Sequence, residues 1–150
     1  MDEALLKRVL PHSVEAERSV IACMLIDREA IISASEILVQ DDFYQNQYGV
    51  MFGAMVELFN EGSPVDMVTL QNRLKEKDIP PELISLELFK EIMDVVPVSV
   101  NIKSYAGIVR EKSVMRRLIK VNEEIANTCY AGKERLEDIL AYTEKAIFDL

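Results

Sequence analysis

The segment from Ile102 to Tyr130 contains no proline over 29 residues. Its apolar residues recur at helical spacing, and proline is the residue that most reliably stops a helix. The segment is therefore predicted to form one helix about 44 Å long, because an α-helix rises 1.5 Å per residue. Gly132 is predicted to end this helix, since glycine readily adopts the left-handed conformation that closes a helix.

Apolar residues follow the helical period in nearly every other segment as well. Ser13, Asp27 and Asp66 are each predicted to be the N-cap of a helix, because their side chains can accept from the first free amides. Further helices are predicted for residues 41–59, for residues 82–95 and from about residue 134 onward. We find no strand alternation of useful length and no internal repeat. The sequence therefore predicts an all-α fold, with a compact helical head followed by a long antiparallel helical hairpin.

Val96-Pro97 is the clearest boundary in the chain. Pro97 cannot continue the preceding helix, and Asn101 can cap the next one. Residues 1–97 are therefore predicted to form the head and residues 98–150 the hairpin. The first turns of the long helix are expected to face back onto the head through Ile102, Tyr105, Ala106 and Val109.

The later turns of the long helix carry an apolar stripe that spans about 180°. One arm of a hairpin covers a narrower stripe than this, so we expect part of it to contact another polypeptide. The alternative is that the head folds over the surplus. The residues predicted to bind a second copy or another protein are Val114, Met115, Leu118, Ile119, Val121, Ile125 and Ala126.

Composition and charge exclude several classes of protein. Apolar residues make up 49% of the chain and charged residues 29%, which excludes disorder and low-complexity linkers. The formal net charge of −9 argues against a surface that wraps nucleic acid. Residues 101–120 nevertheless hold six bases against Glu111 alone. This basic segment indicates either pairing with an acidic segment or an ordinary solvated helix face.

The sequence has no feature of a membrane or exported protein. Its longest apolar run, Val20 to Ile26, has seven residues, whereas a membrane span needs about 18 or more. Asp2 and Glu3 stand where a signal peptide would carry basic residues. We therefore expect a soluble, cytoplasmic protein without a membrane partner.

No catalytic or nucleotide-binding motif occurs in the sequence. Gly132 is the only glycine that precedes a lysine, and Glu134 stands where a phosphate loop has Ser or Thr. His12 is the only histidine, and Cys23 and Cys129 are both expected to be buried thiols. We accordingly predict no catalytic residue, no cofactor and no metal site, which favours a non-catalytic interaction module. Gly49-x-x-x-Gly53 is expected to allow close local packing on its helix.

Five segments occur in an order and spacing that are specific in combination. They are Pro11-His12-Ser13-Val14-Glu15-Ala16-Glu17, Asp42-Phe43-Tyr44, Pro64-Val65-Asp66-Met67-Val68-Thr69-Leu70, Val96-Pro97 with Asn101-Ile102 and Tyr105-Ala106-Gly107-Ile108-Val109, and Glu111-Lys112-Ser113-Val114-Met115-Arg116-Arg117-Leu118-Ile119. Glu144-Lys145-Ala146-Ile147-Phe148 continues the match. From about Leu10 to Leu150, the chain resembles the amino-terminal domain of the bacterial replicative DNA helicases of the DnaB family.

The resemblance implies that hairpins pair into dimers and that three dimers form a collar above a hexamer of RecA-like motors. It also implies that the collar recruits the primase DnaG. ATP, magnesium and DNA would be bound only by a motor domain that would follow a linker after Leu150, so the parent protein would be an ATP-dependent DNA helicase. Ile119 and Ile125 match positions where the family presents apolar residues to primase, and Leu88 stands where close relatives often have Tyr.

Two other functions compete with this one. A weak single-stranded-DNA-binding module could use the bases of the long helix, but such sites usually interleave aromatic residues, and only Tyr105 is available. A free-standing enzyme would need a motif that the sequence lacks. The bases in question are Lys103, Arg110, Lys112, Arg116, Arg117 and Lys120.

Overall fold

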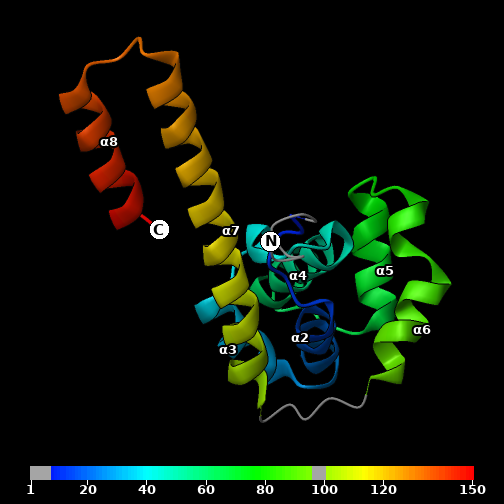
Figure 1. Cartoon of the computed structure of the whole chain (residues 1–150). Coiled ribbons are helices and arrows are strands. Elements are labelled where there is room, and N and C mark those ends of the chain that lie inside the picture. The colour runs from blue at the N-terminus through cyan, green and yellow to red at the C-terminus, as the bar shows by residue number, and fades with distance from the viewer. Residues whose placement is uncertain (1–7, 96–100) are drawn as a thin grey trace. The chain divides into compact units, whose positions relative to one another are not determined.

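A computed structural model of the chain describes residues 8–95 and 101–150, and every regular element within those ranges is helical. The prediction of an all-α fold is therefore confirmed. The elements are α2 (Val14–Ile26), α3 (Arg28–Ile37), η1 (Gln40–Asp42), α4 (Asn46–Asn60), α5 (Met67–Glu76), η2 (Pro81–Ile84), α6 (Leu86–Asp94), α7 (Ile102–Ala131) and α8 (Leu136–Phe148). The α-helices are labelled in Figure 1.

The chain divides into two compact units, and α7 contributes to both. One unit, the head unit, runs from His12 to Arg110, and the other, the hairpin unit, joins Glu111–Leu150 to the chain before His12. The predicted boundary between residues 97 and 98 falls on residues 96–100, which lie outside the described residues. That boundary stays a prediction.

The three predicted N-caps are confirmed. Ser13 Oγ accepts from the amide of Ala16 at 3.2 Å, and the Asp27 carboxylate accepts from the amide of Glu29 at 3.0 Å. Asp66 and Thr69 cap each other's amides in a reciprocal pair. These bonds satisfy amides that a helix cannot pair internally.

The core of the head unit lies among α2, α3, α4, α5 and α6. Helix α2 packs against α3, α4 and α6, while α4 packs against α3, η1 and α5. The first turns of α7 add Ile102, Ala106 and Val109 to this core, and Tyr105 packs against it while partly exposed. The expectation that these turns face the head is confirmed. The largest fully buried apolar side chains of the head core include Ile21, Met24, Ile31, Tyr48, Met51, Met55, Leu70, Leu74 and Ile92.

The predicted helix over residues 41–59 is wrong at its start. A short 3-10 helix ends at Asp42, and α4 begins only at Asn46. The reason lies in Glu17, which is 1% exposed and accepts from the amides of Tyr44 at 2.9 Å and Gln45 at 3.0 Å. Because this distant carboxylate holds the two amides, the backbone there need not be helical.

The predicted helix over residues 82–95 is likewise interrupted. Pro81–Ile84 forms the 3-10 turn η2, and α6 starts afresh after Ser85. Ser85 Oγ accepts from the amide of Leu88 at 3.2 Å, so Ser85 caps a new helix rather than continuing an old one.

Gly49 and Gly53 allow η1 to pack directly on α4, as expected. A Cβ atom on Gly49 would lie 2.9 Å from the carbonyl oxygen of Gln40, and one on Gly53 would meet the Gln40 side chain. A larger residue at position 49 would push η1 away from α4, whereas one at position 53 would displace only the Gln40 side chain. The Gly-x-x-x-Gly spacing therefore serves packing within the head.

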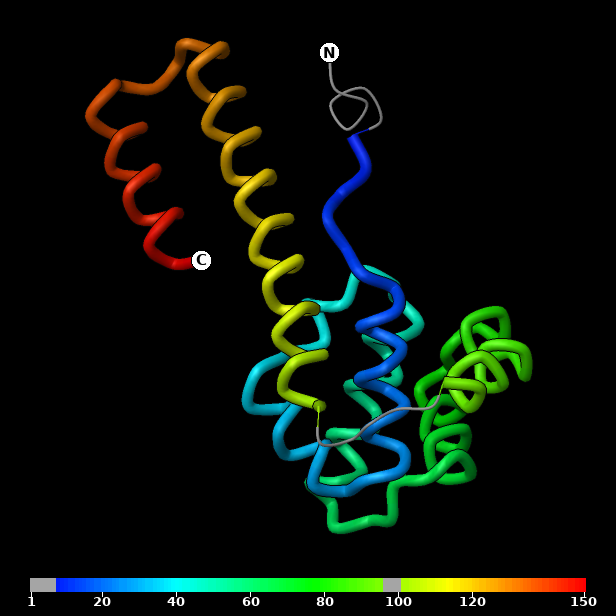
Figure 2. The backbone as a smooth tube through the Cα atoms, turned by 60° about the horizontal axis from the view of Figure 1, so that its bottom comes forward, coloured from blue at the N-terminus to red at the C-terminus, as the bar shows by residue number. Residues whose placement is uncertain are grey.

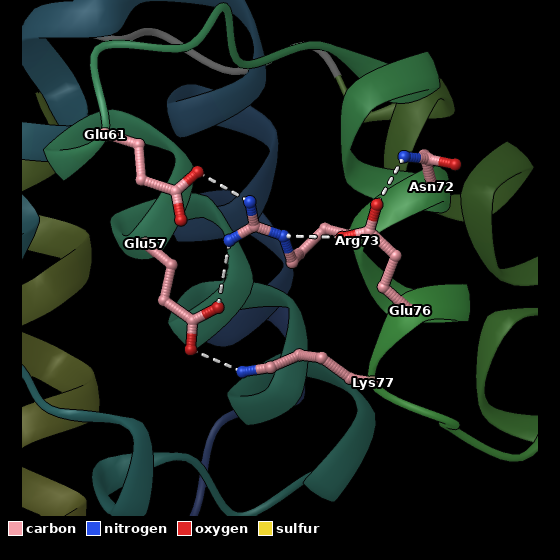
Figure 3. Close-up of polar contacts among 6 residues, drawn as sticks. All are labelled: Glu57, Glu61, Asn72, Arg73, Glu76 and Lys77. Atoms are coloured by element: carbon pink, nitrogen blue, oxygen red, sulfur yellow. Dashed lines mark hydrogen bonds and ion pairs between the residues drawn. The ribbon is translucent and has the colours of Figure 1, made fainter.

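Helices α4 and α5 are also joined by a network of charges, shown in Figure 3. Arg73 pairs with Glu57 at 3.2 Å, with Glu61 at 2.6 Å and with Glu76 at 3.3 Å, and Lys77 also pairs with Glu57. These bonds hold the pKa of Glu57 below its usual value, chiefly through the hydrogen bond from Lys77 and then that from Arg73.

The long helix is confirmed as one element from Ile102 to Ala131. Gly132 ends it with φ of +65°, a conformation that favours glycine. The last helix starts at Leu136, two residues later than predicted, because residues 133–135 complete the turn.

Candidate protein-interaction surface on the hairpin

The hairpin unit consists of the later turns of α7, a four-residue turn and α8. Figures 1 and 2 show α8 running antiparallel to α7, as the sequence predicts. The turn begins where the amide of Gly132 donates to the carbonyl of Thr128 at 3.3 Å. Two helices without a third layer leave much of each surface uncovered.

The seven predicted interaction residues of α7 divide by burial. Val114, Leu118, Val121 and Ile125, which recur at the spacing of a helix–helix seam, are all half-buried. Ile119 is also half-buried, whereas Met115 and Ala126 are exposed. None of the seven is fully buried within the hairpin unit.

Helix α8 carries more uncovered apolar surface than α7. Within α8, all of which the structure describes, Ile139 alone is buried. The exposed side chains are Leu136 at 69%, Leu140 at 54%, Ile147 at 44% and Phe148 at 88%. At helical spacing Leu136, Leu140 and Ile147 share one side of α8 with Ile139, but none of the seven predicted interaction residues lies on α8. The missed signal was the width of that stripe.

Helical geometry places the uncovered residues of both arms on one side of the hairpin. At 100° per residue, Met115, Ile119 and Ala126 lie about 110° around α7 from the half-buried seam. Leu136, Leu140 and Ile147 lie about 80° around α8 from Ile139, in the same rotational sense. Because the arms are antiparallel, equal rotations turn both groups toward the same side. We call these six residues the apolar face.

The opposite side of the hairpin is polar. Glu124 and Tyr142 lie about 90° and 60° from the same two reference lines, in the reverse sense. Tyr142 Oη donates to Glu124 Oε2 at 2.8 Å, so the two are indeed side by side. This hydrogen bond supports the assignment of the apolar face to the other side. It also raises the pKa of the Tyr142 hydroxyl.

Two of the basic residues proposed for single-strand binding form hydrogen bonds within their own units. Arg110 Nη1 donates to Asp42 Oδ1 at 2.9 Å in the head unit. Arg116 Nη1 donates to the carbonyl of Pro11 at 2.8 Å in the hairpin unit. These contacts reduce the charge that α7 offers to a phosphate backbone.

The two cysteines differ in burial. Cys23 is fully buried as predicted, and burial raises the pKa of its thiol to about 11. The prediction that Cys129 is buried is wrong, because its side chain is exposed. Cys129 lies in the last turn of α7, two residues before the helix ends. Among the described residues, no group of three His, Cys, Asp or Glu side chains is placed to hold a metal ion.

Leu88 and Tyr48 are buried in the head. Leu88 is 8% exposed and belongs to the apolar core. Tyr48 is also buried, and its hydroxyl accepts from Arg18 Nε at 3.1 Å. Position 88 therefore offers little side-chain surface to a partner in this chain.

Comparison with known proteins identifies the family. The family model described as the DnaB-like helicase N terminal domain matches residues 9–111, which is more than half of the chain. The chain belongs to this family. The resemblance seen in the five sequence segments is thereby confirmed.

Relatives of this family extend the match to the whole chain. Replicative DNA helicase DnaC of Bacillus subtilis (strain 168) is 36% identical over 150 residues, and replicative DNA helicase DnaB of Geobacillus stearothermophilus is 35% identical over the same length. The match covers 100% of this chain and 33% of the length of each helicase. The chain thus spans about a third of the length of these relatives.

Solved structures confirm the fold. The N-terminal domain of DnaB helicase from Mycobacterium tuberculosis matches with a TM-score of 0.86 and 28% identity, over 93% of this chain and 99% of that one. The N-terminal domain of DnaB helicase from Helicobacter pylori, described with its interactions with primase, matches with a TM-score of 0.70 and 23% identity, over 87% of this chain and 99% of that one.

In the parts of our chain that the structure describes, no helix is long and apolar enough to cross a membrane.

Proposed function

We propose that this chain is the assembly domain of a replicative DNA helicase, and that its hairpin pairs with the hairpin of a second copy. The observation that carries the proposal is the apolar face, on which Leu136, Leu140 and Ile147 are 44–69% exposed. Large exposed apolar surfaces on a folded chain are typical of protein–protein contacts. Two such faces joined by a two-fold axis would form a four-helix arrangement around a shared core.

The energetics favour this pairing. Covering one Leu or Ile side chain contributes about 1.5–3 kcal/mol, and a two-fold contact buries every such residue twice. Pairing into dimers, and of three dimers into a collar, is the arrangement that the family resemblance implies.

We further propose that the assembled domain recruits primase. Ile119 and Ile125 match hairpin positions that the family offers to primase, and the related Helicobacter domain is described with its primase interactions. ATP-driven DNA unwinding would belong to the remaining two thirds of the parent protein, because relatives of that length are replicative helicases. Direct single-strand binding by this domain has less support, since Arg110 and Arg116 are bonded internally.

Substitution within the apolar face tests the proposal. Ile119→Asp and Leu140→Asp would each place an unpaired carboxylate in an apolar contact. We expect each to weaken self-association in sedimentation at least about tenfold, the equivalent of 1.4 kcal/mol. Titration with primase from the same source tests recruitment, and Ile119→Asp is expected to lower that affinity as well.

Val68→Asp on α5 is the matched control, because Val68 is 74% exposed but lies in the head unit. It is expected to leave self-association unchanged, and circular dichroism monitors the fold of all three variants. A parent chain that remains monomeric, or equal association by the parent and both hairpin variants, would contradict the proposal.

A further inference from the structure

The two arms of the hairpin are linked by a polar contact away from the apolar face. Tyr142 on α8 donates to Glu124 on α7 at 2.8 Å, across 18 residues of sequence. Both side chains are exposed. Exposed bonds of this kind add little to the free energy of unfolding of a whole chain. Any effect of this bond is therefore expected within the hairpin itself.

The apolar contact between the arms is thin. Ile139 is the one buried residue in α8, and the seam residues of α7 are only half-buried. The apolar core is formed by helices of the head and the first turns of α7, and no residue of α8 belongs to it. With so few interlocking side chains, apolar packing alone constrains the angle and register of α8 weakly.

The Tyr142–Glu124 bond lies where it can constrain the angle between α8 and α7. It lies on the side of the hairpin opposite Leu140 and Ile147, so a partner on the apolar face would not touch it. Tyr142 nevertheless belongs to the same short helix as those two residues. A rotation of α8 about its axis that breaks the bond therefore also changes the direction in which Leu140 and Ile147 face.

We infer that Tyr142 and Glu124 are positioning residues, whose hydrogen bond fixes α8 on α7 and so presents both halves of the apolar face to a partner together. This inference rests on the proposed function and specifies what holds the same surface in shape. The tyrosine hydroxyl keeps its proton at neutral pH, since its pKa is raised. The bond is therefore available wherever the protein would assemble.

Removing either end of the bond tests the inference on the full chain. Tyr142→Phe removes the donor and Glu124→Ala the acceptor, and each is expected to weaken self-association about three- to tenfold, the range for one hydrogen bond. The double variant is expected to be no weaker than the worse single variant, because both changes break the same bond. Glu124→Gln keeps an acceptor oxygen and is expected to restore most of the affinity.

Tyr130→Phe is the matched control, because Tyr130 is 90% exposed in the same hairpin; it should change affinity less than twofold. Hydrogen exchange of α8 amides, at a concentration where the monomer dominates, measures directly how well α8 is held in place. Tyr142→Phe is expected to speed exchange in α8 and to leave α2 and α4 unchanged. A purely structural role in the whole fold would instead speed exchange everywhere.

The outcomes separate this inference from the proposed function. If the parent associates and Tyr142→Phe associates equally well, the inference is wrong and the proposed function stands. If the parent does not associate, the proposed function is wrong, and hydrogen exchange of the α8 amides then tests the positioning role alone. Faster exchange in Tyr142→Phe than in the parent supports that role, and equal exchange overturns it.

Discussion

Arg110 and Asp42 form an ion pair in which the carboxylate is almost wholly buried. Arg110 Nη1 lies 2.9 Å from Asp42 Oδ1, and the Asp42 side chain is 1% exposed. The other carboxylate oxygen accepts from the amide of Val39 at 2.8 Å. The pair thus joins the end of the head portion of α7 to η1, 68 residues earlier in the chain.

Replacing Arg110 with Leu should destabilise the head unit. The change removes the Arg110 guanidinium from a buried carboxylate, and we expect the free energy of unfolding in urea to fall by about 2 kcal/mol. Arg110→Lys, which keeps the charge, should cost less. Adding Asp42→Asn to Arg110→Leu should recover part of the loss; if it costs as much again, the two residues do not act as a pair.

Glu17 should contribute far more to stability than its neighbour Glu15. Glu17→Ala removes the acceptor for the amides of Tyr44 and Gln45, so we expect a loss of about 2–4 kcal/mol in chemical unfolding. Glu15→Ala is the control, since Glu15 is exposed in the same first turn of α2. Similar losses for both variants would show that the carboxylate acts only through the helix dipole.

The ion network of Figure 3 should give the fold a defined dependence on acid. The pKa of Glu57 is lowered in the folded chain by its bonds to Lys77 and Arg73. Its stabilising effect is therefore present above the unfolded value of about 4.3, and is lost as pH falls through the lower folded value. Glu57→Gln should destabilise the chain most near neutral pH and progressively less toward pH 3.

Urea unfolding of the parent and Glu57→Gln between pH 3 and pH 7 measures this difference. Glu36→Gln on α3 is the control, because Glu36 is exposed and lies away from the α4–α5 network. A constant difference between the parent and Glu57→Gln across this range would mean that the network contributes nothing through the ionised carboxylate.

Local signals in the sequence were sufficient for much of the fold. The absence of proline from Ile102 to Tyr130 and the position of Gly132 predicted α7 to within one residue. Ser13, Asp27 and Asp66 predicted three helix starts, because an N-cap acts on amides only two or three residues away. Where both partners of an interaction are close in sequence, the pattern carries the information.

What the sequence could not supply were contacts between distant residues. Glu17 sits at helical spacing with the buried Val20, Ile21 and Met24, yet only the folded chain shows that its carboxylate holds the amides of Tyr44 and Gln45 and delays α4. The exposure of Cys129 was missed for the same reason, since the helical face of a residue does not reveal which other element covers it.

The candidate interaction surface divides along the same line. The sequence by itself determined that α7 carries a wide apolar stripe, because the helical period fixes which residues share a face. Only the tertiary structure decided that Leu136, Leu140 and Ile147 complete that surface and that Tyr142 meets Glu124 on the other side. Burial depends on how much of each face a second helix covers, and that depends on packing rather than on local propensity.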